Sequence, residues 1–258
     1  MLKKIIKFSS VCKTIVLVSL GVMLLVPLAA FAAPPKANVT KGVNTPFRAL
    51  AAVPGTDLVT ITWENGYGSV IIDKWMLKAD GVTPADWLGR KYDNKTMQEV
   101  INIVYCDQYA TSADNAKSRM ESFFKKAGFN SQWGHSTGYK GYLSGTTFDQ
   151  IPAGNGSTGN AYSDSLTFLT TNNHGRVFGP YYTGKMYVFI AAFSRENMLT
   201  HSFNSFNVAR DALASNLTAK AGFGASNSLS LYNQIASTDT GKTTGDHDGY
   251  AQHVWAPQ

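Results

Sequence analysis

One segment of the sequence matches a known catalytic motif. Gly134-His135-Ser136-Thr137-Gly138 has the G-x-S-x-G pattern of the nucleophile elbow of α/β-hydrolases. In that fold a buried strand enters a sharp turn with the serine at its apex, and a helix follows directly. Here residues 129–133 are too polar for a buried strand, and Gly141 interrupts the expected helix. This context argues against a nucleophile elbow. Because the motif itself is present, a secreted serine hydrolase that uses Ser136 remains an alternative to the leading hypothesis given below. The acid and base that it would need later in the chain are available as Asp164, Asp211 or Asp239, followed by His247 or His253.

A second group of polar residues lies at the ends of two predicted strands. A hairpin of strands 175–178 and 186–193, joined across 180–185, would bring His174 to the same end as Ser194 and Arg195. Polar side chains at one end of an apolar ribbon indicate a pocket for an anion or a polar ligand. The alternative is that Arg195 and Glu196 form surface ion pairs, with each other or with neighbouring residues. The predicted binding residues are His174, Arg176, Ser194, Arg195 and His201.

The histidines do not form a recognisable metal motif. None of His135, His174, His201, His247 and His253 has the spacing of H-E-x-x-H. Asp246-His247-Asp248 is the densest group of potential ligands, but the sequence places no further ligand beside it, which favours a solvated loop. We therefore predict no metal and no cofactor. A metal-dependent enzyme that uses His174, His201 and Asp246-His247-Asp248 is the second alternative.

Residues 1–32 are typical of a secretory signal peptide. Four lysines precede an apolar run over 15–28, and Ala30-Phe31-Ala32 supplies the small-x-small cleavage pattern. The apolar run is shorter than the about 20 residues that cross a bilayer. We therefore expect cleavage after Ala32, no membrane span in the mature protein, and a periplasmic or extracellular location. The lysine-rich start indicates a bacterial protein.

The mature chain would be nearly neutral. Residues 1–32 contain four of the 23 Lys and Arg and none of the 17 Asp and Glu, so the remainder carries a formal charge of +2. This weak charge argues against nucleic acid as a partner. Cys106 is the one cysteine after residue 32, and its place at the end of an apolar strand pattern predicts a buried thiol without a disulfide.

The pattern of turns and apolar residues predicts one domain after an extended lead-in over 33–56. We predict a single α+β domain over 57–258, with a mixed β-sheet and at least two packed helices. The helices are expected after a capping pattern at Thr111 and Asp114, ending at Gly128, and over 206–217. The strands expected beside the hairpin above are 58–63 and 69–73 around Asn65-Gly66, 101–106, 139–143, 166–170, and 250–255 at an edge.

Several short runs between about residues 98 and 220 resemble one bacterial family. They are Ile101-Asn102-Ile103-Val104, Ala127-Gly128-Phe129, Asn173-His174-Gly175-Arg176-Val177, Ala191-Ala192-Phe193-Ser194-Arg195, His201 and Ala209-Arg210-Asp211. In this order they are similar to the LssY C-terminal domain family. The chain departs from the family before Arg210, where Asn204 and Asn207 replace acidic residues.

The family is linked by name to a type I secretion component, and some members carry a membrane phosphatase-like domain. The resemblance implies no established activity and argues against a serine nucleophile. The leading hypothesis is thus a non-enzymatic domain that binds a small ligand or a partner in the cell envelope or in secretion. Whether the protein is an enzyme stays open.

Overall fold

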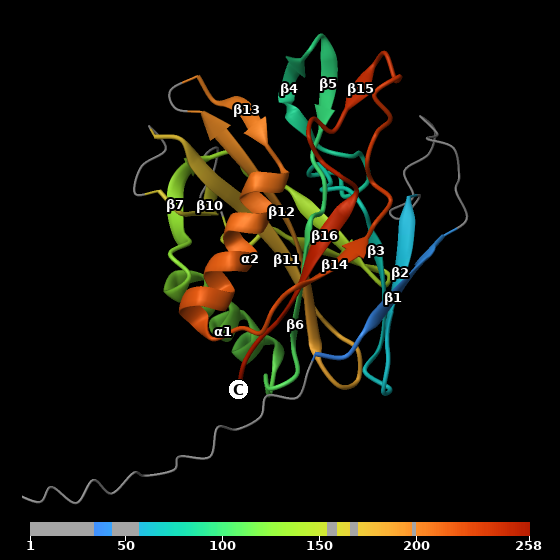
Figure 1. Ribbon diagram of the computed structural model, residues 1–258, viewed down its shortest axis with the longest axis vertical. Coiled ribbons are helices and arrows are strands. Elements are labelled where there is room, and N and C mark those ends of the chain that lie inside the picture. The colour runs from blue at the N-terminus through green and yellow to red at the C-terminus, as the bar shows by residue number, and fades with distance from the viewer. Residues whose placement is uncertain (1–33, 43–56, 154–158, 166–169, 198–199) are drawn as a thin grey trace, which may run out of the picture. The chain divides into compact units, whose positions relative to one another are not determined.

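An eight-stranded sheet forms the centre of the fold (Figure 1). The computed structural model describes residues 34–42, 57–153, 159–165, 170–197 and 200–258, so the predicted signal peptide lies outside the described residues. Residues Ala33–Gln258 form one compact unit. The strands follow the order β14 (Asn227–Ser230), β16 (Tyr250–Trp255), β6 (Ile103–Asp107), β12 (Tyr187–Asn197), β11 (Asn172–Tyr182), β10 (Gly159–Ser163) and β7 (Asn130–His135), and β13 (Ser202–Ser205) also pairs with β12.

The predicted hairpin of the candidate binding residues is confirmed as β11 and β12. The two strands are antiparallel, and His174 pairs with Ser194 in their register. Gly175 allows the close approach of these strands, since a Cβ at this position would overlap the Phe193 ring and lie 2.5 Å from the Ala192 carbonyl oxygen. The strand predicted at 166–170 lies mostly outside the described residues.

Two smaller sheets complete the β structure. The first has the order β1 (Ala37–Lys41), β2 (Leu58–Trp63), β3 (Gly68–Asp73), β8 (Lys140–Leu143) and β9 (Thr146–Asp149). The hairpin predicted around Asn65-Gly66 is confirmed, with φ of 58° and 71° at these two residues, as a two-residue turn with positive φ requires. The second has the order β15 (Lys242–Thr243), β5 (Lys95–Gln98) and β4 (Asp86–Tyr92).

Two helices pack on one face of the central sheet (Figure 1). They are α1 (Ala113–Lys126) and α2 (Asn207–Ala221). The N-cap of α1 is Ser112, whose side chain accepts a hydrogen bond from the Asn115 amide, so the predicted cap at Thr111 was wrong by one residue. Gly128, with φ of 89°, follows the end of α1 as predicted.

The middle strands of the central sheet are buried on both faces, and alternation along each of them decides which core a side chain joins. Ile103 and Tyr105 of β6 pack with the helices, whereas Val104 and Cys106 pack in the core shared with β2 and β3. Cys106 is fully buried, as predicted, and is a free cysteine within the described residues. The same rule places Val177 with the helices and Phe178 in the other core.

The predicted α+β class was wrong, because the chain is mostly β. Strands make up 47% of it and form three sheets, whereas helices make up only 15%. The polar, glycine-rich segments between α1 and β11 form β7 to β10, although their composition resembles that of loops. Part of the lead-in forms β1, and residues 43–56 lie outside the described part. The strand expected at an edge, β16, instead lies between β14 and β6 and is parallel to β6.

Within the residues that the structure describes, neither helix combines the length and the apolar composition that crossing a membrane requires.

Candidate metal site

A cavity of about 130 Å³ lies at one end of the β11–β12 hairpin. Before the register shift that follows Phe178 in β11, and along β12, side chains at even positions such as Phe178 and Ile190 belong to the sheet face turned away from the helices. The same alternation assigns His174, Arg176 and Glu196 to this face, and all three line the cavity. The other walls come from β4, from Glu99 after β5, from the end of β7, and from the segment that joins β7 to β8. Their lining residues are Trp87, Leu88, Arg90, Gly134, His135, Ser136 and Tyr139, together with His201.

His174 is held in one orientation by a neighbour on its own strand. Its Nδ1 atom lies 2.9 Å from Oδ1 of Asn172, which as an amide oxygen accepts the hydrogen bond. This contact fixes the tautomer with the proton on Nδ1 and leaves the Nε2 lone pair as a possible metal ligand. The side chain is 4% exposed, and burial, with smaller effects of His135 and Arg176, holds its pKa well below the ordinary value of 6.5.

Glu196 is a buried carboxylate that two neighbours orient. Oε1 accepts a hydrogen bond from the Asn172 amide at 3.3 Å and lies 3.8 Å from Nδ1 of His174. Oε2 lies 3.2 Å from Nδ1 of His201. The backbone of His201 is in turn held by Trp87 and Arg90, which donate to its carbonyl oxygen, each at 3.1 Å. Glu196 therefore has a fixed position beside His174.

His135, the last residue of β7, completes the group. Its ring centroid lies 4.6 Å from that of His174, with 24° between the ring planes. The residue is only 6% exposed, and its Nε2 atom has no hydrogen-bond partner within the described residues. Burial, followed by the charge of Arg176, lowers the pKa of His135 to about 4, so the ring is neutral at pH 7.

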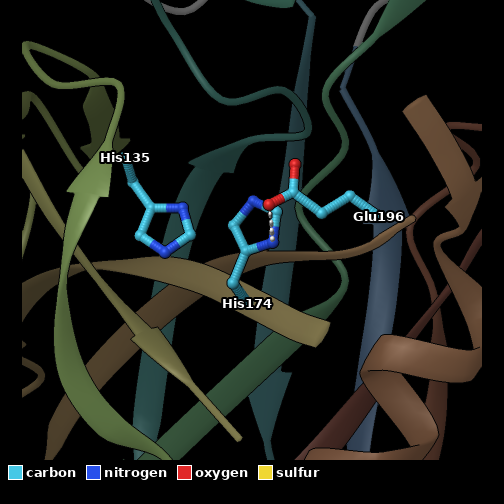
Figure 2. Close-up of side chains that lie close together, drawn as sticks. All are labelled: His135, His174 and Glu196. Atoms are coloured by element: carbon cyan, nitrogen blue, oxygen red, sulfur yellow. Dashed lines mark ion pairs between the residues drawn. The ribbon is translucent and has the colours of Figure 1, made fainter. Parts of the chain in front are cut away.

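His135, His174 and Glu196 form a potential metal-binding group. Each offers one ligand atom, and the three atoms lie within 4.8 Å of one another. In Figure 2 the His135 ring and the Glu196 carboxylate flank the His174 ring. Ligands of a tetrahedral zinc ion at about 2.0–2.2 Å are roughly 3.3 Å apart, so small side-chain rotations suffice to bind the ion. Two imidazoles and one carboxylate form the typical ligand set of a catalytic metal site with an open position.

Glu99 adds a second carboxylate to the cavity. It is 6% exposed, and burial raises the pKa of its carboxyl group to about 7, against the opposing effect of Arg176. Its side chain forms no ion pair within the described part of the chain. Glu99 is therefore a carboxyl group that can exchange a proton near neutral pH beside the three potential ligands.

Ser136 does not have the surroundings of a nucleophile elbow. Its Oγ atom accepts hydrogen bonds from Arg176 Nη2 at 2.9 Å and from the Tyr139 hydroxyl at 3.1 Å. The next element is the strand β8 rather than a helix. Among the residues that the structure describes, Ser136 thus has no base within hydrogen-bond reach, and its contacts assign it a role in holding Arg176.

The cavity contains three of the five binding residues predicted from the sequence, His174, Arg176 and His201. Ser194 and Arg195 are not among the described residues that line it, and Arg195 donates to Asn173 on the opposite face of the hairpin. The sequence analysis did not identify His135 and Glu196 as metal ligands beside His174. It also did not identify Glu99 as a residue of the site. The His174–Ser194 register predicts Glu196 on the face of His174, two residues further along, so that signal was available.

The Asp246-His247-Asp248 group has structural partners away from this cavity. Asp246 accepts hydrogen bonds from the Phe206 amide, at 2.8 Å, and from the Ser205 hydroxyl at the start of α2. His247 is fully buried, with Nε2 2.7 Å from Asn233 Oδ1, and Asp248 pairs with Arg210. The Asp246-His247-Asp248 segment therefore contributes no ligand to the group formed by His135, His174 and Glu196.

Comparison of the chain with models of protein families, with curated proteins and with solved structures finds no match. The resemblance to the LssY C-terminal domain family therefore stays a prediction from the sequence.

Proposed function

We propose that the protein is a metal-dependent enzyme whose centre binds one divalent transition-metal ion through His135, His174 and Glu196. The observation that carries the proposal is the proximity of the three ligand atoms, within 4.8 Å of one another in a cavity. Zn²⁺ fits this mixed nitrogen and oxygen set best, and Fe²⁺ is the principal competitor for two histidines and one carboxylate. This proposal replaces the non-enzymatic, ligand-binding domain that the sequence analysis favoured with an enzyme that binds a metal ion.

The pKa values of the two imidazoles support metal binding at neutral pH. Metal ligands must be unprotonated, and burial holds the pKa of both His135 and His174 below neutrality. Asn172 and His201 supply the outer contacts that orient the ligands. Such a centre is therefore largely preformed.

The chemistry that fits an open zinc site is hydrolysis. A zinc ion held by His135, His174 and Glu196 would lower the pKa of a water and would polarise an oxygen of the substrate. Glu99 is available in the same cavity to accept the proton of an attacking water. If residues 1–32 direct export, this activity belongs to the periplasm or the exterior of the cell.

Calorimetric titration of the chelator-treated protein with zinc chloride tests the proposal. We expect one ion per chain, and binding at least tenfold weaker in Glu196→Gln, because the variant replaces a charged ligand with a neutral amide. Glu64→Gln is the matched control, since Glu64 is exposed on the turn between β2 and β3. Absence of stoichiometric binding of Zn²⁺ and Fe²⁺ to the unmodified protein would refute the proposed function.

A further inference from the structure

Arg176 is a buried cation that lines the cavity of the metal site. It is 4% exposed, yet its guanidinium has no carboxylate within ion-pair distance in the described part of the chain. Nε and Nη2 donate to the Ser136 carbonyl oxygen at 3.3 and 3.1 Å, and Nη2 also donates to Ser136 Oγ. None of these contacts uses Nη1. Nη1 of Arg176 is therefore a charged donor that can bind a ligand in the cavity.

The position of Arg176 is fixed before any ligand arrives. Its guanidinium lies over the Tyr139 ring, 4.9 Å from the centroid. The Tyr139 hydroxyl donates to Ser136 Oγ, which also accepts from Arg176 Nη2. A guanidinium held in place loses little entropy when it binds, and its planar donors match the oxygens of a carboxylate or a phosphate. Arg176 is thus preorganised for an oxyanion.

The charges around the cavity also favour an anionic ligand. The buried charged groups of the lining are two carboxyl groups, Glu99 and Glu196, and one guanidinium group, that of Arg176, whereas Arg90 is exposed. A divalent ion added to these three buried groups leaves an excess of at least one positive charge. Buried charge is costly unless it is compensated, so an anion is the ligand that the loaded site favours.

We infer that the metal-loaded cavity binds the oxyanion group of a small substrate, a carboxylate or a phosphate, with one oxygen on the metal ion and another on Arg176. This inference rests on the proposed metal site and adds the substrate class. A volume of about 130 Å³ admits such a group, whereas a larger part of the substrate must remain outside. Arg176 acts by binding substrate, and Ser136 and Tyr139 act as positioning residues.

The test uses the zinc-loaded full chain and two probes, inorganic phosphate and acetate, in separate calorimetric titrations. We expect at least one probe to bind, and Arg176→Gln to weaken that binding at least tenfold while zinc binding persists. Lys125→Gln, which removes an exposed cation from the last turn of α1, is the matched control and should bind the probe as the unmodified protein does. The probe that binds more tightly identifies the oxyanion.

Arg176→Lys is a second variant that keeps the test informative if Arg176→Gln does not fold. Lysine keeps the charge but lacks the fork of donors, so we expect binding several-fold weaker than in the unmodified protein. If the zinc-loaded protein binds neither probe, or if both Arg176 variants bind as tightly as the unmodified protein, the inference is overturned. Failure of the unmodified protein to bind either Zn²⁺ or Fe²⁺ would instead refute the proposed function itself.

Discussion

The imidazole rings of His135 and His174 lie with their centroids 4.6 Å apart, although their strands are separated in the sheet by β10. His135 is the last residue of β7, and His174 lies near the start of β11. Two imidazoles this close cannot both be protonated without repulsion, and the charge of His135 is one of the causes that lower the pKa of His174. A single cation bound by two neutral rings uses their proximity and avoids this repulsion.

The first prediction separates the two faces of the β11–β12 hairpin. Arg195 pairs with Asn173 across the hairpin, so we expect Arg195→Gln to leave zinc binding unchanged within about twofold. His174→Asn, on the other face, should weaken zinc binding at least tenfold. Calorimetric titration of both variants checks this. Equal losses in the two variants would mean that the assignment of faces is wrong.

This contrast also shows how much of the site the sequence could predict. The hairpin itself followed from two apolar runs, and it correctly brought His174 and Ser194 to the same end. Grouping Arg195 with His174 ignored the period of two, which sends adjacent residues of a strand to opposite faces. Applied strictly, the period selects Glu196 instead.

Other parts of the fold could not be predicted in this way. His135 reaches the cavity because β7 pairs with β10, and both strands are polar segments without a clear alternating pattern. Their pairing depends on contacts between distant parts of the chain, which local composition does not encode. The three-stranded sheet that contributes Trp87 and precedes Glu99 was missed for the same reason.

The second prediction concerns stability in acid. His253 is 1% exposed, Trp63 Nε1 donates to its Nε2 atom at 2.9 Å, and burial lowers its pKa to about 3. Because the unfolded chain binds the proton with the ordinary pKa near 6.5, the stabilisation is complete above that pH. It is lost as the pH falls from about 6.5 to about 3, by up to about 1.4 kcal/mol per pH unit.

Urea unfolding of the zinc-free protein at pH 7 and pH 5 measures this effect. We expect a lower free energy of unfolding at pH 5, and a difference between the two pH values that is about 1–2 kcal/mol smaller in His253→Gln. Glutamine keeps an acceptor for Trp63 but does not titrate. An unchanged difference in the variant would argue against a neutral His253 in the native state.

The third prediction tests the tight packing next to His174. A Cβ at Gly175 would overlap the Phe193 ring, so we expect Gly175→Ala to destabilise the protein by about 1–3 kcal/mol. Gly224→Ala is the control, since no atom of the described part of the chain lies within 4 Å of a Cβ at that position. Thermal unfolding of the two variants gives the comparison. Equal midpoints would contradict the packing described for the hairpin.

The fourth prediction concerns Ser136. Its hydroxyl is bonded to Arg176 and Tyr139, so we expect no covalent labelling by a fluorophosphonate probe. Ser136→Ala should cost about 1 kcal/mol of stability, through the lost hydrogen bonds, and should weaken oxyanion binding by loosening Arg176. Mass spectrometry detects the label. A probe adduct on Ser136 that Ser136→Ala abolishes would revive the serine hydrolase alternative.

The most direct test of the metal site is X-ray diffraction from crystals of the zinc-loaded protein, with data collected on both sides of the zinc absorption edge. We predict one anomalous peak at about 2.0–2.2 Å from a ring nitrogen of His135, a ring nitrogen of His174 and an oxygen of Glu196. A zinc peak on other residues, with these three side chains unchanged and no ion between them, would contradict the proposed centre.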